Sequence, residues 1–168
     1  MALGLFLLRL VVGLTLATHG AQKLFGWFGG PGVDATGVWM EGAGFRPGRH
    51  HAVAAGLAET GGGILLALGF ITPFAAAAVF SVMLVAAAAL AKNGFFATNG
   101  GYEYPIVLGT AGLTLAFTGP GSLSLDALLG FSMRGAVWGA AAGVFGAVGA
   151  LIAVLSRRTT PVAAAMSN

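Results

Sequence analysis

The sequence predicts an all-α integral membrane protein: a four-helix bundle followed by one additional C-terminal transmembrane helix. Only 8% of the 168 residues are charged and 57% are hydrophobic, whereas soluble domains carry roughly 25% charged residues. Five stretches, one of them marginally, reach the length of about 20 apolar residues that is needed to cross a hydrocarbon core of about 30 Å. The 29 glycines follow no three-residue period, so we expect them to let helix backbones approach closely within lipid.

The residue types exclude several kinds of chemistry. The chain has no cysteine and only three histidines, so thiolate nucleophiles, iron–sulfur clusters and cysteine-based zinc sites are excluded, and no metal site is expected. The eight lysines and arginines lie at helix ends and in loops, so the bilayer is the expected partner and nucleic acid is not. Any redox chemistry would have to pass through a bound cofactor or a partner.

Each predicted span is bounded by recognisable signals. The five ranges are 3–25, 52–70, 73–91, 104–118 and 135–155. Pro73 suits the first turn of the third helix, Gly119-Pro120 ends the short fourth helix, and Arg157-Arg158 follow the fifth. We expect the first span to be retained rather than cleaved, because its first positive charge, Arg9, lies inside the apolar run.

The chain divides into a core and an extension. Residues 1–127 are predicted to form the four-helix core, and residues 128–168 add the fifth helix and a short tail. The loop 26–51 joins the first two spans. Within it, residues 33–45 mix apolar side chains such as Trp39 with acidic residues and glycines, which favours a short amphipathic helix at the membrane interface.

The distribution of positive charge predicts the membrane orientation. With five spans, the loops 26–51 and 92–103 and the C-terminus lie on one side of the bilayer. That side carries most of the lysines and arginines, whereas the other side has Arg134, together with Arg9 if it is counted there. Positive residues accumulate in the cytoplasm. We therefore predict that both loops and the C-terminus are cytoplasmic and that the N-terminus lies outside.

Polar residues within the spans give the strongest functional signal, because ionisable groups are costly in a bilayer and usually face the bundle interior. His19 and Lys23 are four residues apart and share a helix face. Glu59 lies at the same depth of the second span, roughly 10 Å from the same surface. Tyr102 and Glu103 lie near that surface. These five residues are the candidate polar or quinone-binding site.

The same residues also have structural interpretations. Glu103 could be a helix-end residue that reaches the interface, and Tyr102 could belong to an interfacial aromatic belt. Glu59 is flanked by glycines, so a neighbouring helix can approach it closely and pair with its carboxylate. A pair with His19 or Lys23 would serve either as structural glue or as a proton site, and the sequence leaves both open.

Other residues have structural predictions alone. Arg9, inside the first span, is expected to form a structural ion pair, and Asp126 to cap a turn. Gly135, Gly139 and Gly143 follow a four-residue spacing in the fifth helix. Such a stripe of small residues is a helix-packing face. Its target could be this bundle, a second copy or another subunit.

A set of short motifs carries a family resemblance. They are LR at 8–9, HGAQKLFG at 19–26, WFGGPG at 27–32, AE at 58–59, GGG at 61–63, LG at 68–69, GFF at 94–96, NGGYEYP at 99–105, GPG at 119–121 and LSLD at 123–126. Taken together over residues 5–127, they resemble the DoxX family of small bacterial membrane proteins. The resemblance implies a four-helix bundle in the bacterial inner membrane, made by the first four spans, with the fifth helix beyond it.

The resemblance also carries expectations about function. It implies a relation to the membrane subunit of thiosulfate:quinone oxidoreductase. Mycobacterial members are associated with a membrane oxidoreductase complex that includes superoxide dismutase and a sulfurtransferase. The first hypothesis is therefore a membrane subunit of a quinone- or sulfur-linked redox complex, with a quinone as cofactor near Glu59 and other redox subunits as partners. The second is a non-catalytic scaffold that recruits partners. A transporter is less favoured, because no inverted repeat is visible.

Overall fold

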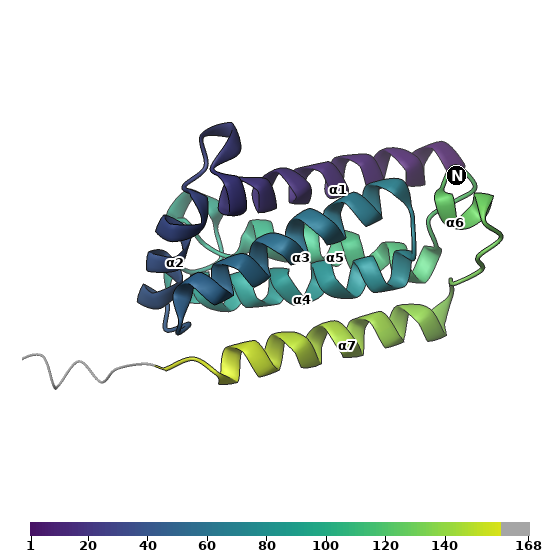
Figure 1. The fold of residues 1–168 in the computed structure, drawn as a ribbon. Coiled ribbons are helices and arrows are strands. Elements are labelled where there is room, and N and C mark those ends of the chain that lie inside the picture. The colour runs from purple at the N-terminus through teal and green to yellow at the C-terminus, as the bar shows by residue number, and fades with distance from the viewer. Residues whose placement is uncertain (159–168) are drawn as a thin grey trace, which may run out of the picture.

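The computed structural model describes residues 1–158, and within that range it is built from helices without strands (Figure 1). The helices are α1 (Ala2–Phe25), α2 (Gly32–Gly42), α3 (Gly48–Leu68), α4 (Thr72–Leu90), α5 (Glu103–Thr118), α6 (Leu125–Leu128) and α7 (Ala136–Leu155). The all-α class predicted from the sequence is confirmed. Part of the predicted C-terminal tail lies outside the described residues.

Four of these helices are long and apolar enough to cross a membrane: α1, α3, α4 with the turn that follows it, and α7. The remaining predicted span, the fourth (104–118), corresponds to α5, which has only 16 residues. At 1.5 Å per residue it extends for about 24 Å, somewhat less than the hydrocarbon core of about 30 Å. It lies within the bundle, packed mainly on α4 and also against α7 and α1.

The chain runs back and forth so that its connections gather at two ends (Figure 1). One end holds α2, the segment 91–102 and the last turn of α7; we call it the α2 end. The opposite end holds the N-terminus, the turn between α3 and α4, and α6; we call it the α6 end. This arrangement is the one that five antiparallel spans predict.

Glycines bring α1 and α3 into backbone contact. A β-carbon at Gly63 would lie 2.5 Å from the carbonyl oxygen of Gly13, and one at Gly20 would lie 2.6 Å from the carbonyl oxygen of Gly56. Lipid supplies no hydrophobic force between helices, so close van der Waals packing of this kind is what holds them together. Of the glycines around Glu59, Gly56 and Gly63 therefore face α1 and Gly62 faces α4, whereas a β-carbon at Gly61 would meet no atom within 4 Å.

The short helix α2 is attached to the bundle. It was predicted over residues 33–45 at the membrane interface, and it forms from Gly32 to Gly42. It packs mainly on α3, where the Glu41 carboxylate accepts a hydrogen bond of 3.0 Å from the backbone N–H of Gly48. This carboxylate thus satisfies one of the N–H groups that have no partner within the first turn of α3.

The additional helix α7 packs along α4 and α5. A β-carbon added at Gly139 would overlap the ring of Phe117, and one at Gly143 would be in ordinary contact with Leu113. A β-carbon at Gly135 would meet no atom within 4 Å, although the N–H of Gly135 donates to the carbonyl oxygen of Phe117 at 2.9 Å. Of the three candidate targets for the glycine stripe, the structure thus shows that Gly139 and Gly143 face this same bundle.

The outer surface of the bundle is as apolar as its centre. Exposed side chains include Val11 and Leu14 on α1, Leu57 and Ile64 on α3, and Phe145 and Ile152 on α7. A surface of large apolar side chains on several helices is what lipid contact requires, whereas monomeric soluble proteins rarely expose it.

Candidate functional site

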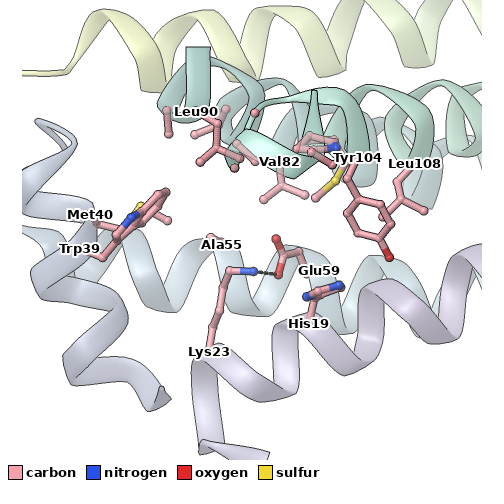
Figure 2. Close-up of a pocket in the computed structure, with 18 residues that line it drawn as sticks. His19, Lys23, Trp39, Met40, Ala55, Glu59, Val82, Leu90, Tyr104 and Leu108 are labelled. Atoms are coloured by element: carbon pink, nitrogen blue, oxygen red, sulfur yellow. Dashed lines mark hydrogen bonds and ion pairs between the residues drawn. The ribbon is translucent and has the colours of Figure 1, made fainter. Parts of the chain in front are cut away.

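A cavity of about 420 Å³ lies inside the bundle at the α2 end (Figure 2). Helices α1 to α5 all contribute to its walls, which are mostly aliphatic: Ala55, Val82, Met83, Ala86, Leu90 and Leu108 are among the lining residues. The volume falls in the range of small-molecule sites, about 300–1,000 Å³, and such sites are typically apolar with a few placed polar groups.

An ion pair between Lys23 of α1 and Glu59 of α3 lies in the floor of this cavity. Lys23 Nζ donates to Glu59 Oε2 at 2.5 Å, with the two side chains 24% and 3% exposed. Figure 2 shows the other carboxylate oxygen of Glu59 directed toward the cavity. His19, Lys23 and Glu59 thus line one cavity, and of the two predicted partners, Lys23 is the one that Glu59 contacts.

His19 lies one helical turn before Lys23 and also lines the cavity. Its ring packs edge-on against Tyr104 of α5, with ring centroids 5.7 Å apart at 64° (Figure 2). His19 and Tyr104 thus face each other across the space between α1 and α5. Both rings carry hydrogen-bonding atoms at the edge of an apolar chamber.

Two residues of α2, Trp39 and Met40, form the opposite wall (Figure 2). Trp39 was predicted to lie in an interfacial helix and was not assigned to the site. The amphipathic pattern was the available signal, but it predicts only that one face is apolar and not which cavity that face covers. The walls of the site therefore include a helix that had been predicted only to lie at the membrane interface.

Tyr102 and Glu103, which were predicted as members of the site, do not line the cavity. The Glu103 carboxylate accepts a hydrogen bond of 2.9 Å from the N–H of Ala97, and the ring of Tyr102 packs edge-on against Phe95 at 5.5 Å. Both side chains face the segment 91–102. Tyr104, one residue later, is the side chain that reaches the cavity, because α5 begins at Glu103 and turns successive residues by about 100°.

A second buried polar group lies at the α6 end, so the polar residues do not gather at one end alone. Arg9 is fully buried and donates from Nη2 to the carbonyl oxygen of Leu123. Within residues 1–158 it takes part in no ion pair within 4.0 Å, so the structural ion pair predicted for Arg9 is corrected to a contact with backbone. This carbonyl belongs to the segment after α5, which packs against α1. No pattern in the sequence predicts this contact.

Asp126 is the buried carboxylate of the α6 end. It accepts hydrogen bonds of 2.7 Å from the N–H of Ile71, 3.0 Å from the N–H of Thr72 and 2.7 Å from the Thr72 hydroxyl. These donors lie at the first turn of α4, whose N–H groups have no partner within the helix. The capping role predicted for Asp126 is thus seen, although the helix that it caps is distant in sequence.

No group of three or more His, Asp or Glu side chains suited to a metal ion occurs in the described part of the chain. His51 packs against the ring of Phe45 with centroids 5.4 Å apart, and neighbouring His50 is exposed. These histidines therefore take part in packing and in the surface of the α2 end.

The ion pair and four of the five helices that line the cavity fall within a recognisable family domain. The DoxX family model matches residues 4–92, which is just over half of the chain. The chain belongs to the DoxX family. The matched part of this DoxX protein includes His19, Lys23 and Glu59 and ends before Tyr102. No curated protein and no solved structure matches the chain.

Proposed function

We propose that this DoxX protein is an integral membrane subunit of a quinone- or sulfur-linked redox complex and that it binds a quinone or a similar apolar carrier in the cavity at the α2 end. The observation that carries the proposal is the Lys23–Glu59 ion pair, which lies in a mostly aliphatic cavity of about 420 Å³. Buried charges in a membrane bundle are costly and usually mark a functional site.

The residues around the cavity suit a ring that carries carbonyl groups. The Lys23 ammonium can donate to a carbonyl oxygen, and His19 and Glu59 can hold or release a proton beside it. Aliphatic side chains of α4 and α5 would contact the ring and the start of an apolar tail. Reduction of a quinone to a quinol takes two electrons and two protons. The electrons would come from a partner subunit, because the chain has no cysteine.

Binding of decylubiquinone to the purified protein in lipid nanodiscs tests this proposal. We expect Glu59→Gln to weaken binding by about tenfold or more, because the variant loses the charge that orients the Lys23 ammonium. A hydrogen bond from that charged group to a quinone carbonyl would contribute roughly 1.5–3 kcal/mol. Glu103→Gln is the matched control, because that carboxylate lies at the same end but outside the cavity. Absence of binding, or an equal loss in both variants, would contradict the proposal.

The alternative function is a non-catalytic scaffold, in which the Lys23–Glu59 pair only joins α1 to α3. The sequence argument for it used the glycine stripe of the fifth helix, and Gly139 and Gly143 of that stripe pack within the chain. What favours it now is the apolar face of α7 that lies away from α4 and α5, with Phe145 73% and Leu155 74% exposed. Purification in a mild detergent combined with the binding assay distinguishes the two: a scaffold co-purifies with partners but does not bind decylubiquinone.

A further inference from the structure

Arg157, just beyond α7, reaches across the α2 end to the segment that joins α2 to α3. Its Nε and Nη2 donate to the carbonyl oxygen of Ala43 at 2.9 and 2.7 Å. Its guanidinium carbon lies 4.9 Å from the centre of the buried Phe45 ring. The N–H of Arg158 donates to the carbonyl oxygen of Gly44 at 2.8 Å. The end of α7 thus holds three consecutive residues of this segment.

The held segment is bonded directly to the residues that wall the cavity. The N–H of Ala43 donates to the carbonyl oxygens of Trp39 and Met40 at 3.0 and 3.1 Å, and the N–H of Phe45 donates to that of Met40 at 2.9 Å. A displacement of residues 43–45 would therefore be transmitted to the last turn of α2. Because backbone hydrogen bonds fix this turn, Trp39 and Met40 would move with it.

A second cavity of about 400 Å³ lies between α1 and α2 and shares a wall with the first one. His19, Lys23 and Trp39 line both cavities, and Gln22, Pro31 and Thr36 line the second alone. Since α2 packs more extensively on α3 than on α1, its α1 side is the weaker contact. Movement of Trp39 away from α1 would join the two cavities into a single passage.

We propose that α2 is a lid over the cavity and that Arg157 is the positioning residue that holds the lid closed. The occupant of the cavity rests on the function proposed above, whereas the lid itself does not. An apolar carrier with a ring and a tail would enter between α1 and α2 when the last turn of α2 moves outward. The additional helix α7 thereby regulates access to a site to which it contributes no lining residue.

The absence of cysteine from the chain allows a direct test by labelling single introduced cysteines with N-ethylmaleimide. Met40→Cys reports the closed lid, since Met40 is 6% exposed, and Val38→Cys, at a position 74% exposed on the same helix, reports the intrinsic labelling rate. We expect Arg157→Gln to raise the rate at Met40→Cys by about tenfold and to leave Val38→Cys unchanged. That factor corresponds to the loss of charge-assisted hydrogen bonds.

Three further variants distinguish a lid from general loosening. Arg158→Gln is the matched control, because the Arg158 side chain is exposed and its backbone bond is kept; we expect no change. Arg157→Lys keeps the charge and should restore slow labelling in part. Ala142→Cys, 3% exposed on α7, should label slowly in all backgrounds.

The proposal is overturned if Arg157→Gln leaves the rate at Met40→Cys unchanged. It is also overturned if Ala142→Cys accelerates equally, since Arg157 would then anchor α7 as a whole. These measurements need no ligand. Faster labelling without decylubiquinone binding would therefore support the lid and contradict the proposed quinone binding. Decylubiquinone binding with an unchanged labelling rate would support quinone binding and contradict the lid.

Discussion

Lys23 and Glu59 depend on each other because the bundle removes most of the water around them. A buried charge whose partner is removed typically costs 3–5 kcal/mol, whereas removal of both partners costs far less. Glu59 is the more buried of the two, with its side chain 3% exposed against 24% for Lys23. Replacing Lys23, which leaves the Glu59 carboxylate buried without a partner, should therefore destabilise the fold more than replacing Glu59.

We predict that Lys23→Met lowers the free energy of unfolding by about 3 kcal/mol. Glu59→Gln should cost less, because Lys23 is long enough to reach the interface. The double variant Lys23→Met/Glu59→Gln should recover most of the loss. Thermal unfolding in detergent, monitored by size-exclusion chromatography after heating, gives the melting temperatures of the three variants. Equal stability of Lys23→Met and the parent protein would mean that Glu59 is not held by this contact.

Gly69, at the turn between α3 and α4, combines two constraints. Its φ of 62° lies in the left-handed region, and a β-carbon there would overlap the guanidinium of Arg9. Gly130 has a φ of 75°, and a β-carbon added there would meet no atom within 4 Å. A substitution at Gly130 therefore tests the backbone conformation alone, without a clash. We predict that Gly130→Ala costs about 1–2 kcal/mol and that Gly69→Ala costs clearly more. Melting temperatures of the two variants measure the difference; if they match, Arg9 yields freely to the new methyl group.

At the scale of secondary-structure elements, the α1–α3 contact gives a matched pair of glycines on one helix. A β-carbon added at Gly63 would overlap the backbone of α1, whereas one added at Gly61 would meet no atom within 4 Å. We predict that Gly63→Ala lowers stability by about 1–3 kcal/mol, as overpacking does. Gly61→Ala should be neutral or slightly stabilising, because alanine is the better helix former. The same melting assay tests both, and similar losses would argue against close backbone packing.

The sequence was sufficient to predict the elements because each one has a local cause. Apolar length fixes the spans, glycine and proline end them, and helical rise places His19 and Glu59 at one depth. The interior walls were not predictable in the same way. Trp39 lines the cavity only because α2 folds back on α3, and Arg9 finds its partner in a loop more than a hundred residues away. Such contacts depend on tertiary packing, which periodicity does not encode.

At the scale of the whole molecule, α7 adds a fourth long helix beside the short helix α5. With 16 residues, α5 is the shortest of the bundle helices, and α7 covers α4 and α5 along one side. The two ends then differ in charge. Exposed Arg46, Arg49 and Lys92 lie at the α2 end, and exposed Arg134 lies near the α6 end.

This asymmetry predicts that the α2 end faces the cytoplasm, because positive residues are retained on that side during insertion. Single cysteines can test the orientation in a chain that has none of its own. Val38 at the α2 end and Leu128 at the α6 end are both exposed, at 74% and 79%. With a membrane-impermeant maleimide added to intact spheroplasts, Leu128→Cys should be labelled at once and Val38→Cys only after permeabilisation. The reverse pattern would place the α2 end outside, and the lid and its cavity would then open to the extracytoplasmic side of the membrane.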